Sequence, residues 1–462
     1  MSIQRYIGDR VFYRRLFAVM VPILIQNVIT NFVGLLDNVM VGQVGTEPMS
    51  GVAIVNQLVF VFNLCLFGGL AGAGIFTAQF YGKGDLEGVR NTFRIKLYFA
   101  ALVLLISEAI FLLGGDSLIR LFLHEGQEDL DLAATLAYGR QYLAVMLVQI
   151  VPFTVTQLYA STLRETGETV LPMRAGLTAV FVNLVFNYIL IFGKLGAPAL
   201  GVVGAAWATV LARLVECSIV MLWAHRHKER LPYMEGLYRT LKVPGHLLGQ
   251  VALLGTPLLI NELLWSAGMA TLNQCYSLRG LEVVSAFNIS TTISDLFFCA
   301  FIAMGSSISI IVGQLLGSGE LEKAVEEDRK LIAFSVTMSF FLAAILALVG
   351  PLIPQVYNTT DSVKHLAGRL LLVSAAFMPA HAFSNAAYFT LRCGGKTIIT
   401  FLFDSAFTWV VNIPVAFVLS RFTAVPIVPM FVAVESTNLL KCLIGVIMVR
   451  SRKWVRNLVA DQ

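Results

Sequence analysis

The sequence predicts an all-α integral membrane protein with about twelve transmembrane helices, arranged as two parallel repeats of six. Composition, the length of the apolar runs and an internal duplication each support this fold class. Of the 462 residues, 57% are hydrophobic and only 13% are charged, with a mean hydropathy of +0.78. Soluble domains carry about 25% charged residues, so a water-soluble protein is excluded. The net charge of +5 is too small to indicate a nucleic-acid partner.

The apolar runs have the length of membrane-spanning helices. A spanning helix needs roughly 20 mainly apolar residues, because lipid offers no hydrogen-bond partner for unpaired backbone groups. We expect spans at about residues 15–41, 51–79, 97–121, 136–160, 176–192, 201–223, 248–276, 284–315, 331–357, 366–390, 398–420 and 423–448. The first run is too long for the apolar region of a signal peptide, so we expect it to be retained.

Basic residues gather on alternate hydrophilic segments. One side holds 24 of the 33 Lys and Arg residues, the other side holds seven, and two lie inside spans. The positive-inside rule then places both termini in the cytoplasm. We therefore expect a multi-pass protein of the cell (plasma) membrane.

The chain is internally duplicated. At an offset of 235 residues Pro22 matches Pro257, Gln79 matches Gln314 and Gly82 matches Gly317, and later blocks match at offsets of 228 (Gly167 with Gly395) and 225 (Asn187 with Asn412, Cys217 with Cys442). Each repeat holds about six helices, an even number, so the two copies enter and leave on the same side and are parallel. Such repeats are common in secondary transporters.

The longest polar connection divides the two copies. We predict an N-terminal six-helix lobe over residues 1–223, a cytoplasmic linker over 224–247 and a C-terminal six-helix lobe over 248–462.

Sequence motifs for enzymatic chemistry are absent. The segment Gly394-Gly395-Lys396-Thr397 lacks the first glycine of a phosphate-binding loop, and HExxH and GxSxG do not occur. The six cysteines form no CxxC pair, which argues against a zinc site or a disulfide framework. We expect no enzyme activity, no cofactor and no resident metal.

The informative residues are ionisable groups within the predicted spans, because each costs about 2.5–3.5 kcal/mol at a helix centre in hydrocarbon. They are Asp37, Glu108, Arg213, Glu216, Glu262, Asp295, Asp404, Glu435 and Lys441. Arg213 and Glu216 are three residues apart, which favours a neutralised pair on one helix face. Lys441 lies within reach of the inner membrane surface, and we expect it to snorkel there. His381 is either a hydrogen-bonded structural residue or part of a pore.

Asp37 breaks the internal symmetry. Its repeat counterpart is Leu272, although the neighbouring Pro22 is matched in the second copy. Asp37 follows Pro22 by 15 residues, and a proline permits a helix to bend. Burial favours a neutral carboxyl group and a wet opening favours an ionised one, which is what a proton carrier requires. The alternative is that Asp37 only holds neighbouring helices together through polar contacts.

Three further polar positions are candidates. Glu262 follows Pro257 by five residues as Asn27 follows Pro22, so the two copies carry equivalent polar positions that differ in charge. Glu262 is either a second coupling group or one member of an ion pair. Asn183 and Asn187 share a helix face, where their amides could contact Asp37, a cation or a substrate, or only hold helices together.

Three segments carry a resemblance to the multidrug and toxic compound extrusion (MATE) family. They are VPILIQNVITNFVGLLDNVMVGQVGTEPMSGVA, FTAQFYGKGDLEGVR and NYILIFGKLGAPALGVVGAAWATVLARLVE. The resemblance spans nearly the whole chain. It implies two six-helix lobes around a central cavity, and export of amphipathic, often cationic, compounds in exchange for protons or sodium.

The resemblance also implies roles for single residues. Asp37 resembles the family's first-helix coupling Asp, and Pro22 its kink-forming Pro. Asn183 and Asn187 are similar to the fifth-helix polar pair, and Glu262 to the seventh-helix coupling Glu. The tenth-helix Asp of sodium-coupled members appears here as Asn385, which puts sodium coupling, with a sodium ion near Glu262, in doubt without excluding it.

These observations lead to one expected function and three alternatives. We expect alternating access driven by Asp37, and by Glu262 with it, with Pro22 and Pro257 as hinges and Asn183, Asn187 and Asn385 in the cavity. The expected partners are membrane lipid and drug-like small molecules, and we expect a monomer that binds no nucleic acid. The alternatives are a flippase or exporter for a lipid-linked or endogenous metabolite, a membrane enzyme and a passive channel.

Overall fold

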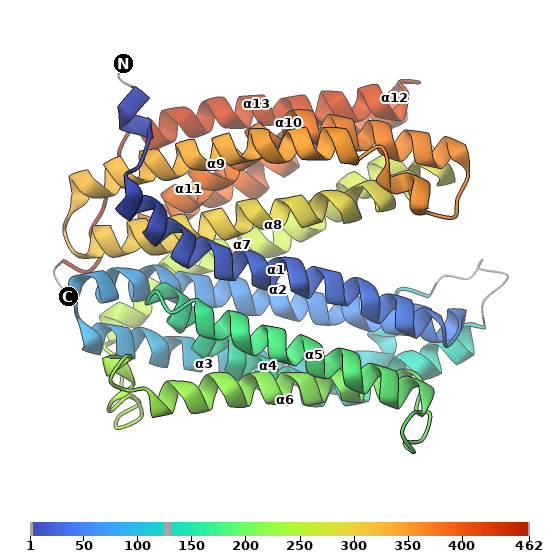
Figure 1. Cartoon of the computed structure of the whole chain (residues 1–462), viewed down its shortest axis with the longest axis horizontal. Coiled ribbons are helices and arrows are strands. Elements are labelled where there is room, and N and C mark those ends of the chain that lie inside the picture. Colours follow the sequence, from blue (N-terminus) through green and yellow to red (C-terminus); the bar gives the residue numbers. More distant parts are fainter. Residues whose placement is uncertain (1–2, 124–130, 461–462) are drawn as a thin grey trace. The chain divides into compact units, whose positions relative to one another are not determined.

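The computed structural model describes residues 3–123 and 131–460 (Figure 1). Twelve helices in these ranges are long and apolar enough to cross a membrane, as predicted. Their bounds are α1 Arg10–Gly42, α2 Thr46–Lys83, α3 Leu86–Arg120, α4 Leu132–Glu165, α5 Val170–Phe192, α6 Val202–Arg226, α7 Gly245–Ser277, α8 Leu281–Gly317, α9 Leu321–Val349, α10 Asp361–Cys393, the composite span Thr397–Phe422 and α13 Ile427–Arg450. Short 3-10 helices cover Ile3–Tyr6 (η1), Pro232–Met234 (η2) and Ile353–Val356 (η3). The described residues contain no β-strand.

Many helices extend beyond the apolar runs that predicted them. Helix α3 begins at Leu86 instead of near residue 97, and Asp85 caps it by accepting a hydrogen bond from the Gly88 amide at 2.9 Å. A capping carboxylate satisfies one of the free amide groups of a first turn, so a polar helix start is stable without an apolar sequence. Arg90, Arg94 and Lys96, which the apolar pattern assigned to a loop, therefore lie on this helix.

The eleventh span departs from regular α-helix. It consists of α11 (Thr397–Phe401), two π-helical stretches at η4 (Leu402–Ala406) and η5 (Thr408–Asn412), and α12 (Ile413–Phe422). A π-helical turn holds an extra residue and rotates the side chains that follow, and such turns occur frequently at functional sites. Hydrophobicity alone does not reveal this irregularity, because it does not change the length of an apolar run.

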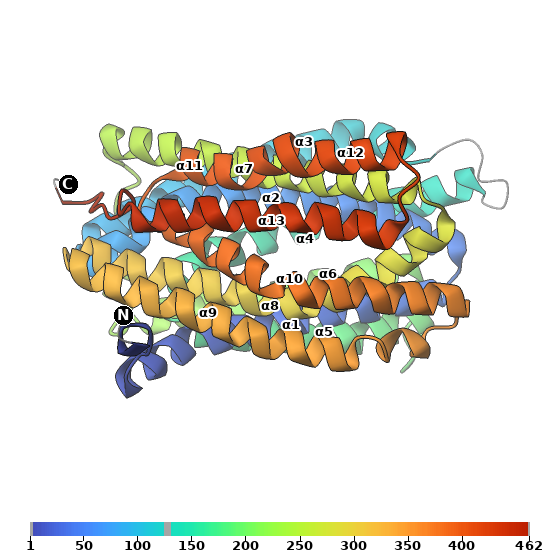
Figure 2. The same cartoon turned by 90° about the horizontal axis from the view of Figure 1, so that it is seen from above.

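Contacts divide the chain into two compact units. The first comprises Met1–Leu24, Ala78–Gly84 and Ala252–Gln462, and the second comprises Ile25–Thr77 and Asp85–Val251. In the first unit α10 packs against α8, α9 and α13, and in the second α6 packs against α4 and α5 (Figures 1 and 2). The described segments nearest the two chain ends, η1 and the stretch after α13, belong to the first unit and lie at the same end of its helices (Figure 1). An even number of crossings between them accounts for this placement.

The duplication is visible as a reciprocal contact within the first unit. A Cβ atom on Gly82 of α2 would lie 1.9 Å from the carbonyl oxygen of Gln314 on α8. A Cβ atom on Gly317 of α8 would lie 1.9 Å from the carbonyl oxygen of Gln79 on α2. Glycine is required at both places because any side chain would collide with the facing backbone. Repeat-related residues of α2 and α8 thus exchange the same contact within the first unit.

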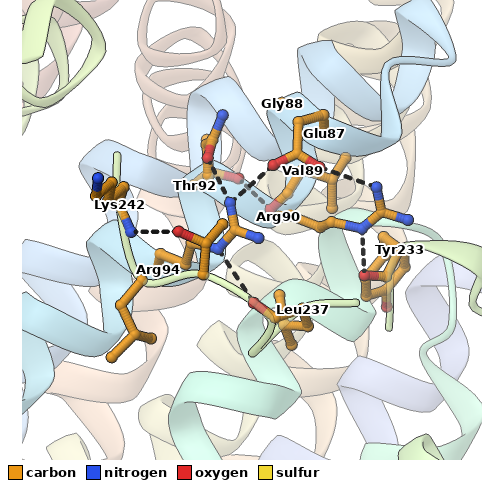
Figure 3. Close-up of polar contacts among 12 residues, drawn as sticks. Glu87, Gly88, Val89, Arg90, Thr92, Arg94, Tyr233, Leu237 and Lys242 are labelled. Carbon is orange, nitrogen blue, oxygen red and sulfur yellow. Dashed lines mark hydrogen bonds and ion pairs between the residues drawn. The ribbon is translucent and has the colours of Figure 1, made fainter. Parts of the chain in front are cut away.

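The connection between α6 and α7 is bound along helix α3 (Figure 3). Three donors four residues apart on α3 bond to three carbonyl oxygens four residues apart in the connection. Arg90 Nε, Arg94 Nε and Tyr98 Oη donate to the carbonyl oxygens of Tyr233, Leu237 and Leu241 at 3.2, 3.1 and 2.7 Å. The polar segment that separates the repeats is therefore fastened to the N-terminal half of the chain over much of its length.

A cluster of ring side chains fastens the same connection to α4 and α6. The Tyr159 hydroxyl lies 3.0 Å from His225 Nε2 and also bonds to the Tyr238 hydroxyl. Burial raises the pKa of the Tyr238 phenol, which therefore stays protonated and able to donate. The connection is anchored by side chains as well as through its backbone.

Candidate functional site

Asp37 lies on α1 and is held by a chain of amides on α5. Asn187 Nδ2 donates to Asp37 Oδ1 at 2.5 Å and to Asn183 Oδ1 at 3.1 Å, and Asn183 Nδ2 donates to the Thr209 hydroxyl at 3.3 Å. Both asparagines are almost fully buried, whereas Asp37 is half-buried. The structure therefore brings together three of the residues that the sequence singled out.

One atom of this chain of amides is unpaired. Asn187 Oδ1 is buried and accepts no hydrogen bond from any described group. An ionised carboxylate only accepts hydrogen bonds, whereas a protonated carboxyl can also donate one. The Asn187 amide, which offers both a donor and an acceptor, can therefore serve either protonation state of Asp37.

Arg213, the basic residue inside α6, is engaged with a carboxylate of its own helix. Its Nη1 atom bonds to Glu216 Oε2 at 2.7 Å, and its guanidinium lies 5.1 Å from the centre of the Phe153 ring. The predicted Arg213–Glu216 pair is confirmed. Among the described residues no cation forms an ion pair with Asp37.

The C-terminal half contains a second polar cluster, and here one expectation is wrong. Lys441 on α13 does not snorkel to the membrane surface, because its Nζ bonds to Asp404 Oδ1 at 2.7 Å. Asn261 Nδ2 donates to the other Asp404 oxygen at 3.2 Å. The sequence signal for this pair was one Asp and one Lys within the last two spans. Pairing lowers the free-energy cost of burying each charge in hydrocarbon.

Glu262 lies beside this cluster without joining it. It is half-buried and feels the charges of Asp404 and Arg392. No hydrogen bond or ion pair joins Glu262 to another described side chain, so the ion-pair alternative finds no partner in that part of the chain. Its coupling role stays a prediction.

The remaining candidates lie on α10 and in the two proline-containing helices. Asn385 Oδ1 is buried against Gly305 and accepts no hydrogen bond from a described group. His381 Nε2 lies 2.7 Å from Glu435 Oε2, which favours the hydrogen-bonded structural role. Helices α1 and α7 continue through Pro22 and Pro257, and the hinge role of both prolines stays a prediction. Within residues 3–123 and 131–460, no three His, Cys, Asp or Glu side chains gather to hold a metal ion.

An internally duplicated chain with twelve candidate membrane-spanning helices is typical of multi-pass membrane transporters. The MatE family matches residues 22–189 and 257–418 of this chain, which is more than half of its length. The chain therefore belongs to the MatE family, whose members are transporters and not enzymes.

Individual relatives agree over nearly the full length. The chain is 24% identical to a probable multidrug resistance protein NorM of Thermotoga maritima, covering 96% of this chain and 94% of that protein. It is 25% identical to the multidrug resistance protein MdtK of Pectobacterium atrosepticum, covering 90% and 89%. Among solved structures, an outward-facing multidrug resistance MATE family transporter superposes with a TM-score of 0.84 at 21% identity over 97% of each chain. A transporter of the MOP superfamily from Pyrococcus furiosus superposes with a TM-score of 0.85 at 20% identity over 97% of each chain.

Proposed function

We propose that this transporter exports amphipathic, often cationic, small molecules in exchange for protons by alternating access, with Asp37 as the proton carrier. The relatives described as multidrug resistance proteins support the substrate class. The Asp37–Asn187 contact supports the coupling ion. It is the single observation that carries the proposal, because it holds a membrane carboxylate against an amide that suits either protonation state.

The energy of proton entry is sufficient for this exchange. One charge moving down about 100 mV supplies about 2.3 kcal/mol, and each pH unit adds about 1.36 kcal/mol. Together they sustain a concentration ratio of several hundredfold per proton, because about 1.4 kcal/mol corresponds to tenfold. Protonation then changes the relative stability of two conformations, and substrate and proton occupy the cavity in turn.

The same proposal places a monomeric protein in the plasma membrane, with both termini in the cytoplasm, as the distribution of Lys and Arg supports. Sodium is the alternative coupling ion, with Glu262 as its ligand. A flippase for a lipid-linked metabolite would need several free cationic side chains, whereas Arg213 is committed to Glu216.

The test is efflux from proteoliposomes with proton and sodium gradients imposed separately. We expect efflux to follow the proton gradient and to fall to background in the Asp37→Asn variant, because the amide carries no titrating proton. Glu108→Gln on α3 is the matched control, since it also removes one carboxylate from the N-terminal half, and it should keep wild-type efflux. Proton-driven efflux that survives in Asp37→Asn removes Asp37 from the mechanism.

A further inference from the structure

The ion pair between Asp404 and Lys441 is built into the interior of the C-terminal half. The side chains of Lys441 and Asp404 are only 12% and 21% exposed. The Lys441 ammonium also lies 5.2 Å from the centre of the Phe403 ring, where the negative face of the ring attracts a cation. Lys441 is therefore held by a carboxylate and an aromatic face, as a bound cation would be.

The backbone around Asp404 is irregular in a way that presents its carboxylate. Asp404 belongs to the π-helical stretch η4. The next residue, Ser405, donates from its amide and hydroxyl to Asn261 Oδ1 at 3.3 and 2.7 Å. These bonds hold Asn261 so that its Nδ2 faces Asp404. Lys441 and Asn261 thus occupy one oxygen each of a fixed carboxylate.

Oxygen atoms suited to a metal cation also belong to residues next to Asn261. Glu262 follows Asn261 in the chain, and the Tyr388 hydroxyl lies 3.4 Å from Asn261 Nδ2. Carboxylate and hydroxyl oxygens are ligands for hard cations. With the ammonium removed, the Asp404 carboxylate would have no ion-pair partner among the described residues.

The N-terminal half has the opposite arrangement at the equivalent place. The repeat counterparts of Asn261 and Lys441 are Gln26 and Glu216, and Asp404 corresponds to Gly176 at the offset that matches Gly167 with Gly395. A Cβ atom on Gly176 would lie 3.3 Å from Gln26 Nε2 and 3.7 Å from Glu216 Oε1. The same three positions therefore meet in both halves, but only the C-terminal half carries the Asp and the Lys.

We propose that Lys441 is a resident cation that occupies a monovalent-cation site at the Asp404 carboxylate. The C-terminal half consequently takes up no sodium ion, and removal of the ammonium converts the cluster into a sodium site. This inference deepens the proposed function, on which it rests for the choice of proton over sodium. Its test measures binding and needs no transport.

The experiment is equilibrium binding of radiolabelled sodium ion to the purified full-length protein in detergent. We expect no saturable binding to the wild type or to Lys441→Arg, which keeps a cation. Saturable binding should appear in Lys441→Met and disappear again in Lys441→Met/Asp404→Asn. Lys364→Met removes a Lys from a more exposed pair with Asp361, and this matched control should bind no sodium.

A second measurement shows whether Lys441→Met is folded and whether sodium stabilises it. Its thermal unfolding midpoint should rise when sodium replaces N-methylglucamine in the buffer, because an ion that binds only the folded state stabilises it. The midpoint of the wild type should not move. The proposal is overturned by sodium binding to the wild type that Asp404→Asn removes, or by a folded Lys441→Met that neither binds sodium nor gains stability from it. Loss of proton-driven efflux with these binding results intact would refute the proposed function alone.

Discussion

The two halves of this transporter share a scaffold and differ in where charge lies inside it. In the N-terminal half, Asp37 lies against buried amides and forms no ion pair with a described residue, whereas the buried carboxylate of Glu216 is neutralised by Arg213. The C-terminal half carries its buried Lys–Asp pair at Lys441 and Asp404. Duplication supplied equivalent positions, and single substitutions at them give the C-terminal half an Asp404–Lys441 pair where the N-terminal half has Gly176 and Glu216.

The largest effect should come from breaking the charge balance of the C-terminal half. Lys441→Met leaves Asp404 buried without its cation, which should cost about 3–5 kcal/mol of stability. Lys441→Met/Asp404→Asn removes both charges and should recover most of that loss. Thermal unfolding in detergent without sodium measures both variants. Equal destabilisation by the single and double variants would show that the pair does not contribute as an ion pair.

An intermediate effect should appear where the halves are most alike. Gly82→Ala and Gly317→Ala each place a methyl group against a facing carbonyl oxygen, and overpacking of this kind costs about 1–3 kcal/mol. Because the contact is reciprocal, the two variants should lower the unfolding temperature by similar amounts. Gly249→Ala on α7, where a Cβ atom would meet nothing within 4 Å, is the control. A loss in only one of the two glycine variants would contradict the symmetry of the contact.

The smallest effect should come from the contact between α3 and the inter-repeat connection, which only the N-terminal half makes. Tyr98→Phe removes one hydrogen bond between α3 and the inter-repeat connection, worth about 1 kcal/mol. We expect faster proteolysis within the connection with unchanged efflux. Tyr81→Phe on α2 is the comparison, and cleavage of both variants at equal rates would argue against a specific role of the Tyr98 contact.

The sequence predicted the features that depend on hydrophobicity and internal comparison. These are the twelve spans, the duplication and the Arg213–Glu216 pair, whereas the contact of Asn187 with Asp37 was one of several open alternatives. Lys441 was misjudged because its distance from the membrane surface along the helix permits snorkelling, and only the three-dimensional position of Asp404 shows the nearer partner. The π-helical turns that present Asp404 leave no trace in composition or periodicity at this length. The proposed roles of Asp37 and Glu262 stay predictions until the gradients are imposed.

The boundary between the two compact units passes within helices and not only through loops. It divides α1 between Leu24 and Ile25, two residues after Pro22, α2 between Thr77 and Ala78, and α7 between Val251 and Ala252, six residues before Pro257. A loop at such a boundary would be flexible. A helix is stiff, except where a proline removes a backbone hydrogen bond and allows the helix to bend. Bending within α1 or α7 is then resisted elastically, and the stiffness of each helix becomes a quantity that a single proline substitution can tune.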